Sequence, residues 1–295
     1  MDILRVSVLA TLMVLMLFGI LGNAFVAITI LRNTEEHGAI PPVDFITFSM
    51  MGSNILLQVF KDLRLLLNQV GMSCAGGEIF YRLNLFLVTG SRCASVWLTA
   101  ILSVLYYLKI VRPTSMMGLK IQRAAPTSFQ LLAWVPGSIG FLMAVIIFRI
   151  PVADNEGNST ICNFYFLGSS TLLTYNILNV IFGGIIPVIT MVTCSLGVVV
   201  YLCRHRASSV QNQRDIANLR NRHQDKATKT LLILVSFFVV SGGLNIATRN
   251  QSILTNKNLY LWSSLASSLY ITASPFILIS GNHKLRQRMR ELCRH

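Results

Sequence analysis

The feature that most constrains this chain is a series of apolar blocks that are too long for the interior of a soluble domain. Buried strands of an α/β protein would give apolar runs of about 4–8 residues, whereas several blocks here exceed the roughly 20 residues that a helix needs to cross a bilayer. Hydrophobic residues make up 53% of the 295 residues, and charged residues only 12%. The pattern therefore predicts an integral membrane protein built from α-helices.

Seven blocks are long enough to span a membrane, and we expect an all-α, seven-transmembrane helix bundle that forms one domain over residues 1–295. In the tail, Leu285, Met289 and Leu292 fall on one face among cations. This is typical of a short amphipathic helix on an anionic lipid surface. The expected spans cover about residues 6–31, 44–67, 80–111, 127–148, 171–203, 227–246 and 259–280.

The net charge of +14 lies mostly between and after the apolar blocks. Such a distribution argues against a nucleic-acid-binding surface and is typical of membrane topology, because Lys and Arg are retained in cytoplasmic loops. Seven spans with an extracellular N-terminus would place most of the 25 basic residues inside. We therefore expect a multi-pass protein of the plasma membrane with a cytoplasmic C-terminus.

Two pairs of residues would mark the extracellular side. Asn158 and Asn250 each begin an Asn-X-Ser/Thr triplet, which accepts a glycan only in the lumen. Cys74 and Cys162 both fall in loops that we expect outside, where a disulfide is allowed. Sequence spacing leaves open whether these two cysteines are bridged, since a disulfide depends on geometry.

The chain shows no catalytic pattern, and we expect neither an enzyme nor a cofactor or metal. HExxH, GxSxG and P-loop sequences are absent, and the six cysteines form no CxxC pair. A small multispan transporter stays an alternative, because Pro136 in the fourth block and Gly183-Gly184 in the fifth faintly resemble the broken helices of transporters. Seven spans with short loops, one basic inner face and few intramembrane charges favour a receptor.

Arg92 is the charge within a span that most needs an explanation. If its helix begins near Phe80, Arg92 lies about 18 Å along it. Isolation at that depth costs on the order of 2.5–3.5 kcal/mol or more. One interpretation is a structural ion pair, for which Asp62 is the nearest acidic candidate. The other is that Arg92 faces a ligand pocket and favours anionic or hydrogen-bond-accepting ligands.

Polar residues on other blocks extend the second interpretation. Ser and Thr within a span most often serve helix packing, and a minority lining a pocket would give a mostly apolar site with a few polar groups. On the helix of Arg92, three residues fall on roughly the same face, and the fifth and seventh blocks add amides and hydroxyls. The candidate ligand contacts are therefore Arg92, Asn84, Val88, Thr89, Asn176, Asn179, Ser264 and Ser267.

Two stretches carry a resemblance to a known family. W-L-T-A-I-L-S-V-L-Y-Y-L-K-I, Trp97 to Ile110, resembles the W-L-x-x-x-L-x-V-F-Y-x-L-K-I of the type 2 (bitter) taste receptors, seven-span G-protein-coupled receptors. Leu105 replaces the usual Phe. F-I-L-I-S-G-N-H-K-L-R-Q, Phe276 to Gln287, is similar to that family's F-I-L-I-L-G-N-x-K-L-K-Q.

Other positions depart from the taste-receptor pattern. Asn54 stands where that family usually has an Arg, and Ser274-Pro275 stands where it has His-Ser. Type 1 vomeronasal receptors have an Asn and a Ser-Pro-Phe at these positions. Their Leu-Lys-x-x-Ala-Pro also resembles the stretch from Leu119 to Pro126. A vomeronasal-type pheromone receptor is therefore the second choice, and either resemblance implies a chemosensory receptor.

The resemblance also implies a mechanism and partners. A small-molecule ligand would bind among the outer halves of the spans, and the inner ends would open to a heterotrimeric G protein. Tyr106 and Lys109 match the family motif at the inner end of the third span, and Lys226 and Lys229 would mark the moving end of the sixth. The expected partners are thus a small molecule, a G protein and membrane lipid, with no nucleic acid.

Overall fold

The computed structural model describes residues 3–38, 40–69, 77–112, 148–149, 165–166, 169–209, 229–230, 232–241, 257–281 and 283–292. Nearly all of these residues are helical. The helices are α1 (Ile3–His37), α2 (Pro42–Gln69), α3 (Gly77–Val111), α6 (Ser169–Val180), the π-helical turn η1 (Ile181–Ile185), α7 (Ile186–Ser209), α9 (Lys257–Gly281) and α10 (His283–Leu292). Residues 229–230 and 232–241 are also helical, and β1 (Phe148–Arg149) pairs antiparallel with β2 (Tyr165–Phe166).

Four of the described helical stretches are long and apolar enough to cross a membrane. They are Val6–Glu35, Pro42–Leu67, Phe86–Val111 and Ile177–Arg204, and the shorter apolar helices Leu232–Ser241 and Ser264–Ser280 accompany them. This confirms the prediction of a helical membrane protein. The expected fourth span lies outside the described residues apart from Phe148, as do Cys74, Cys162, Asn158, Asn250 and Lys226.

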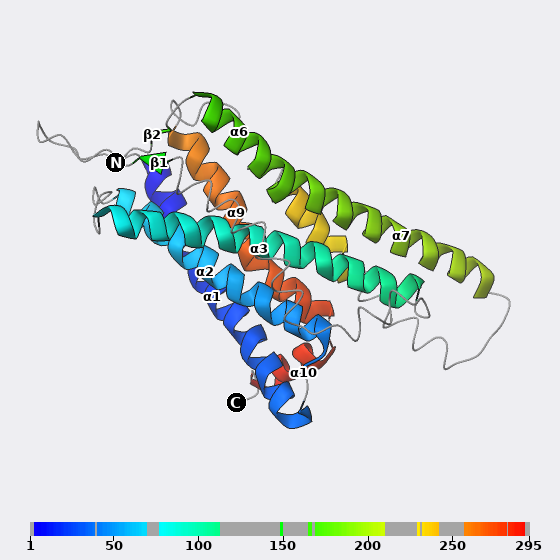
Figure 1. Ribbon diagram of the computed structural model, residues 1–295. Helices are drawn as coiled ribbons and strands as arrows, with labels where there is room; N and C mark the ends of the chain where they lie inside the picture. The colour runs from blue at the N-terminus through cyan, green and yellow to red at the C-terminus, as the bar shows by residue number, and fades with distance from the viewer. Residues whose placement is uncertain are drawn as a thin grey trace, which may run out of the picture.

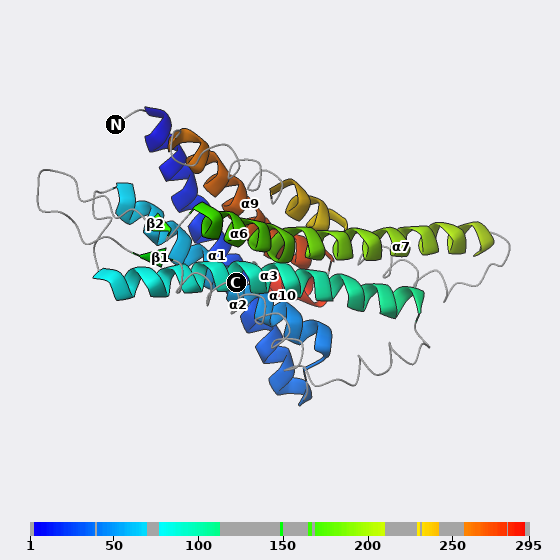
Figure 2. The same cartoon turned by 45° about the horizontal axis from the view of Figure 1, so that its top comes forward.

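The helices run side by side as an elongated bundle, with α3 through its middle (Figures 1 and 2). One end of the bundle carries the starts of α1, α3, α6 and α9 together with the short β1–β2 pair, and the ends of α1, α3, α7 and α9 lie away from it (Figure 1). In the most apolar 18-residue stretch of each helix, 67% of the residues are buried in Phe86–Val111 but only 22% in Ile177–Arg204. Helix α3 is therefore the central element, and α7 is peripheral.

Helix α3 packs on both sides because its apolar residues cover two faces. Leu98, Leu102 and Leu105 recur at helical spacing and join a buried cluster with residues of α1, α2 and α9. Val96 and Ala100, on another face, belong to a second cluster that includes residues of α7, of the helix 232–241 and of α9. The third predicted span thus has the central position that its continuous apolar sequence favours.

The amphipathic helix expected in the tail is present as α10. Its Leu285 is buried and belongs to the same cluster as the leucines of α3, whereas Met289 is exposed. The apolar face of α10 is thus fixed to the bundle through Leu285 and leaves Met289 at the surface.

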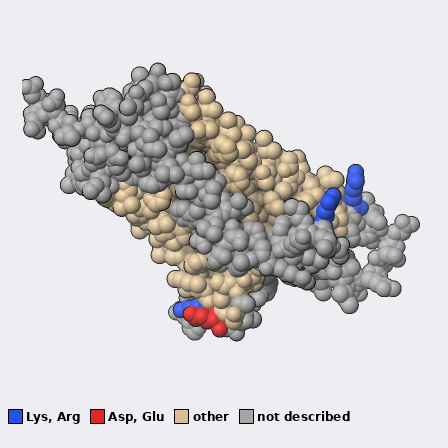
Figure 3. Space-filling model, in the orientation of Figure 1, with Lys and Arg blue, Asp and Glu red and all other residues tan. Residues whose placement is uncertain are grey.

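The charges of the described surface lie at the ends of helices. In Figure 3, charged side chains form two groups at the ends of the described surface, and the rest of the described surface in that view is uncharged. Among the described residues, Lys109 and Arg112 at the end of α3 and Arg204 near the end of α7 are exposed, and Arg32 and Glu35 are exposed near the end of α1. An uncharged surface of this kind is what contact with lipid requires.

The fifth predicted span is continuous from α6 through η1 to α7, and its irregularity has a clear cause. Pro187 has no backbone N–H, and the N–H of Ile186 bonds the carbonyl of Ile181, five residues back. The carbonyl of Phe182 would next accept from residue 187, which cannot donate. The indole Nε1 of Trp97 on α3 donates to this carbonyl instead, at 3.0 Å. A side chain of the neighbouring helix therefore completes the break.

Helix α9 contains a second proline whose freed carbonyl is also bonded. Pro275 deprives the carbonyl of Ile271 of its donor in the helix. That carbonyl accepts from Asn23 Nδ2 of α1 at 3.3 Å and from Ser274 Oγ at 3.0 Å. An asparagine in the middle of a span needs an internal partner, and this contact supplies one for Asn23. Gly22 allows the close approach, because a Cβ there would lie 3.0 Å from Pro275 Cγ.

Candidate functional site

A cavity of about 270 Å³ lies between the helices, on the side of α3 that faces η1 and α9. Its apolar wall comes from several helices and includes Leu57, Val96, Val188, Phe238 and Ile271. A few polar residues interrupt this wall. A mostly apolar, partly enclosed space with a small number of polar groups is the usual form of a small-molecule site.

Helix α3 contributes one continuous face to the cavity. Arg92, Ser95 and Val96 are spaced i, i+3 and i+4, so their side chains leave the same side of the helix, and all three line the space. Arg92 is half-buried and, among the described residues that line the cavity, is the one that carries a charge at neutral pH. A cation therefore lies beside described residues that are apolar or neutral.

The π turn supplies the facing wall. Asn179, Gly183 and Gly184 line the cavity, and the Oδ1 of Asn179 lies 3.0 Å from where a Cβ on Gly183 would stand. A single-turn π segment inside a helix is often found at functional sites, because it displaces side chains from the regular register. Here the turn that Pro187 imposes brings Asn179 and the two glycines to the ligand-sized space.

Two hydroxyls on the cavity wall connect it to a buried polar network. Ser95 Oγ donates to Asn54 Oδ1 at 2.6 Å, and the hydroxyl of Tyr270 lies 3.2 Å from that of Thr99. Thr99 itself donates to the carbonyl of Ser95 at 2.8 Å. Tyr270 must then be the donor of its pair, since a hydroxyl has a single hydrogen.

Asn54 joins four helices in this network. Its Nδ2 donates to Asn23 Oδ1 on α1 at 3.3 Å and to Ser274 Oγ on α9 at 3.0 Å, and its Oδ1 accepts from Ser95 on α3. The network therefore links the wall of the cavity to the proline break of α9. A fully bonded buried network of this kind fixes the relative positions of its helices.

A second polar cluster lies between α2 and α9. Lys61 Nζ donates to the carbonyl of Ser264 at 3.2 Å and to Ser268 Oγ at 2.6 Å, and lies 3.3 Å from Asp62 Oδ1. The three N–H groups of the ammonium are thus all used. Ser268 Oγ also lies 3.4 Å from the same Asp62 oxygen. Lys61 and Asp62 are both buried, so this pair joins α2 to α9 inside the bundle.

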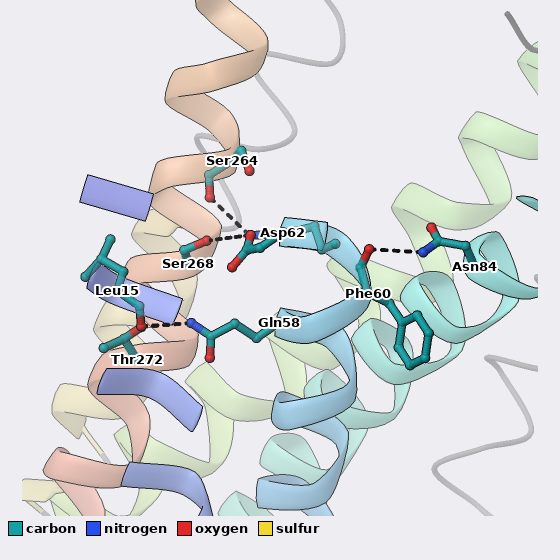
Figure 4. A network of polar contacts seen from close by, with 9 residues as sticks. Leu15, Gln58, Phe60, Asp62, Asn84, Ser264, Ser268 and Thr272 are labelled. Carbon is teal, nitrogen blue, oxygen red and sulfur yellow. Dashed lines mark hydrogen bonds and ion pairs between the residues drawn. The ribbon is translucent and has the colours of Figure 1, made fainter. Parts of the chain in front are cut away.

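Figure 4 shows how α2 directs its polar side chains, with Gln58 and Asp62 both reaching toward α9. Gln58 Nε2 donates to the carbonyl of Leu15 on α1 at 3.0 Å and to Thr272 Oγ1 at 3.3 Å. On the other side of α2, Asn84 Nδ2 reaches from α3 to the carbonyl of Phe60 at 3.0 Å (Figure 4). These contacts hold α1, α2, α3 and α9 together.

The structure separates the eight candidate ligand contacts into groups. Arg92, Asn179 and Ser267 line the cavity. Asn84 and Ser264 are buried in the contacts between helices, and Val88 packs against the cluster around Leu234. Thr89 is half-buried and does not line the cavity. The side chain of Asn176 is not among those that the structure describes.

Several residues of the site could not be singled out from sequence. Lys61 and Asp62 belong to a short run of charged residues, and only the fold shows that both are buried against α9. Ser95 and Tyr270 are ordinary residues of apolar helices until the fold places them on one wall. A possible signal for Lys61 was its four-residue spacing from Leu57 and Leu65, both buried, which puts it on the core side of α2.

Two of the residues expected to contact a G protein, Tyr106 and Lys109, lie toward the end of α3. Tyr106 is partly buried and packs against both clusters that flank α3, whereas Lys109 is exposed. Lys229 is exposed as well. The position of Tyr106 thus depends on how the helices pack, whereas the two exposed lysines are accessible to a partner.

A membrane bundle with a ligand-sized cavity in one half and exposed cations at the far end of the same central helix has the organisation of a receptor. The comparisons with known proteins agree. The family model for taste receptor protein (TAS2R) matches residues 1–295. The sequence is 27% identical to Taste receptor type 2 member 7 of Rattus norvegicus, covering 94% of this chain and 91% of that receptor.

Two other relatives show similar coverage. Taste receptor type 2 member 10 of Homo sapiens is 25% identical, over 92% of this chain and 87% of the receptor. Taste receptor type 2 member 105 of Mus musculus is 22% identical, over 91% and 90%. The chain belongs to the taste receptor protein (TAS2R) family. The prediction of a bitter-taste chemoreceptor coupled to a G protein is thereby confirmed, and the vomeronasal and transporter alternatives are not favoured.

Proposed function

We propose that this receptor binds small molecules in the cavity between α3, η1 and α9 and activates a heterotrimeric G protein at the opposite end of α3. The proposal rests on Ser95 and Tyr270, which belong both to the cavity wall and to the polar network. Both line the cavity, and both bond residues of the polar network that joins α1, α2, α3 and α9. A ligand that contacts this wall differently in two packings of the helices shifts the equilibrium between them.

The site residues follow from this arrangement. Arg92, Asn179 and Ser267 contact the ligand, and Asn84, Val88 and Ser264 support the wall from behind. Thr89 and Asn176 belong to the outer halves of the same two helices and stay candidates on the sequence alone. At the inner end, Tyr106, Lys109, Lys226 and Lys229 act in coupling.

The remaining topology completes the proposal. The chain forms a single domain of seven spans, in which the spans at about residues 127–148 and 227–246 are described only in part and the span at about 259–280 corresponds to α9. The N-terminus is extracellular and the C-terminus is cytoplasmic in the plasma membrane, where α10 lies against lipid. Asn158 and Asn250 are glycosylation sites on the outer side, and Cys74 and Cys162 form the disulfide there.

The cavity is tested by filling it in a cell-based assay of G-protein activation. Ser267→Trp places a large ring in the space and should abolish the response to agonists while the receptor still reaches the cell surface. Leu269→Trp is the matched control, because Leu269 is 44% exposed on the outside of the same helix. Retention of every agonist response in Ser267→Trp would rule out this cavity as the ligand site.

The coupling end is tested separately. Lys109→Ala should abolish signalling and leave surface expression unchanged, because Lys109 is exposed and supports no packing. Arg112→Ala removes a neighbouring exposed cation near the end of α3 and serves as the control. If Lys109→Ala signals like the unmodified receptor, the residue has no part in coupling.

A further inference from the structure

The cavity reaches the outside of the bundle between η1 and the helix 232–241. We infer that this opening, the lateral mouth bordered by Ile185 and Val239, admits ligands from the lipid bilayer. The ligands that it favours are uncharged amphiphiles, which carry a single hydroxyl or carbonyl group on an aliphatic or aromatic body. The inference rests on the proposed use of the cavity as the ligand site and adds the route of entry and the class of ligand.

The first observation is that two residues belong both to the cavity wall and to the outer surface. Ile185 of η1 and Val239 of the helix 232–241 line the cavity and are 45% and 38% exposed. Ile181 and Ile189, four residues before and after Ile185, are also exposed, and residues at this spacing share one side of a helix. Ile185 therefore lies on the outer side of its helix and on the cavity wall, so the cavity reaches the surface at this point.

The second observation is that the same two helices close against each other further along. Helix 232–241, yellow in Figures 1 and 2, lies beside η1 and the start of α7 in both views. Met191 of α7 is fully buried and belongs to one cluster with Leu234 and Val235. The helices are thus packed together near Met191 and separated by the cavity near Ile185, which limits the lateral mouth to the region around the π turn.

The third observation is the character of the surface around the lateral mouth. The exposed side chains of Ile181, Phe182, Ile189 and Val240 are apolar, and the stretch Ile177–Arg204 is long and apolar enough to cross a membrane. The mouth therefore faces hydrocarbon. A molecule that enters there must first dissolve in the bilayer, where a charged group is costly. This route selects uncharged compounds that partition into lipid.

The interior of the cavity suits the same compounds. Val96, Val188 and Ile271 offer an apolar surface to the body of a ligand. Asn179 and Ser267 also line the cavity, and an amide and a hydroxyl can each donate to or accept from an uncharged polar group. A polar group of the ligand that found no such partner would be desolvated without compensation. A compound with one polar group therefore fits better than a compound with several.

The ligand class is tested with n-alkanols from hexanol to decanol, on cells that express the full chain, with G-protein activation as the readout. The half-maximal concentration should fall roughly fourfold for each added methylene, because each one is transferred from water to an apolar site. Diols of the same lengths should act roughly tenfold more weakly, because their second hydroxyl must also be desolvated. Cells without the receptor control for effects on the membrane. A receptor that no alkanol activates, or that responds equally to the diols, overturns the inference.

The route of entry is tested by narrowing the lateral mouth. Val239→Trp should slow both the onset of the decanol response and its decay after removal of the compound, each roughly tenfold, because a barrier at the entrance acts on both directions equally. The half-maximal concentration should then change little. Val240→Trp is the matched control, since Val240 is 63% exposed on the same helix and does not line the cavity. On the facing side, Ile185→Trp and Ile189→Trp form the corresponding pair.

A smaller substitution keeps the test valid if the tryptophan variants do not reach the cell surface. Val239→Ala widens the lateral mouth and should speed both onset and decay. Unchanged rates in Val239→Ala and in the tryptophan variants that reach the surface would contradict the route of entry. Ser267→Trp separates the two proposals. If it abolishes the alkanol response while the mouth variants leave the rates unchanged, the ligand site stands and lateral entry falls; if alkanols still activate it, the ligand site itself falls.

Discussion

Pro187 lies at the start of α7 and Pro275 lies inside α9. Both helices border the cavity, but the carbonyls freed by the two prolines are bonded in different surroundings. The carbonyl freed by Pro275 in α9 is buried and accepts from Asn23 and Ser274. The carbonyl freed by Pro187 at the start of α7 accepts from Trp97, on a flank where Phe182 is 48% exposed. The freed carbonyl is therefore bonded inside the bundle in α9 but on an exposed flank before α7.

The polar contacts of the two helices extend this difference. Helix α9 receives hydrogen bonds from Asn54, Gln58 and Lys61 of α2 in addition to that from Asn23. Helix α7 is peripheral, since only 22% of the most apolar stretch of Ile177–Arg204 is buried, and the bond from Trp97 to the carbonyl of Phe182 joins its π turn to α3. We conclude that α9 belongs to the fixed frame of the bundle, whereas η1 and α7 form the side of the cavity that can adjust to a ligand.

The largest effect is expected where the frame holds a buried ion pair. Lys61→Met leaves the carboxylate of Asp62 buried without its cation, which should cost about 3–5 kcal/mol of unfolding free energy. Thermal unfolding of the purified receptor and the amount at the cell surface would measure it. The double substitution Lys61→Met with Asp62→Leu removes both charges and should recover most of the loss. Equal losses in the single and double variants would show that the pair does not stabilise the frame.

A smaller loss is expected at the proline break of α9. Asn23→Leu removes one donor from the carbonyl of Ile271 and the acceptor of Asn54 Nδ2, which should cost about 1–3 kcal/mol. Thr29→Val is a suitable control on the same helix, because Thr29 Oγ1 bonds only the carbonyl of Phe25, four residues earlier, among the contacts given for it. The same unfolding measurement applies. A control as unstable as Asn23→Leu would refute the role of Asn23.

The corresponding change at the break before α7 should cost less. Trp97→Phe keeps an aromatic ring and removes the N–H that bonds the carbonyl of Phe182. The expected loss of unfolding free energy is about 1 kcal/mol. Pro187→Ala adds a backbone N–H beside the same carbonyl. The two substitutions together should therefore be more stable than the sum of their separate effects predicts, as a double-mutant cycle would show. Additive losses would mean that the indole does not complete the break.

The smallest effect on stability, and a visible one on function, is expected at Gly183. A Cβ there would lie 3.0 Å from Asn179 Oδ1 and 3.6 Å from Cys93 Sγ, so Gly183→Ala should move the wall of the cavity by a few tenths of an ångström. Agonist concentrations for half-maximal response should change by up to about tenfold, with unfolding unchanged. Gly52→Ala is the control, because its Cβ would meet nothing within 4 Å.

The sequence predicts the helices of this fold better than the contacts between them. Apolar block length predicts α1, α2, α3 and the continuous fifth helix, and residue type predicts the irregularity near Gly183 and Pro187. An asparagine in the middle of a span is predicted to need a hydrogen-bond partner, but the identity of that partner depends on tertiary packing. Trp97 and Phe182 lie 85 positions apart in sequence, and no local pattern relates them.

The candidate site was predictable only in part, because it also depends on how the helices pack. A lone Arg in an apolar helix attracts attention because its burial is costly, and Arg92 does line the cavity. Helical spacing from Arg92 upward also selected Asn84, yet that amide bonds the carbonyl of Phe60. A face of a helix is defined by periodicity over about two turns, but which neighbour covers it, α2 or the cavity, is decided by the bundle.

The bond between Asn23 and the carbonyl of Ile271 has a consequence for biosynthesis. The two residues are 248 positions apart, and Thr272 similarly donates to the carbonyl of Leu15 across 257 positions. The contacts between α1 and α9 can therefore form only after α9 has been translated, whereas the amide of Asn23 also bonds the carbonyl of Gly19 within α1 and Asn54 of α2. A receptor truncated before α9 would lack the contacts that join Asn23 and Leu15 to that helix.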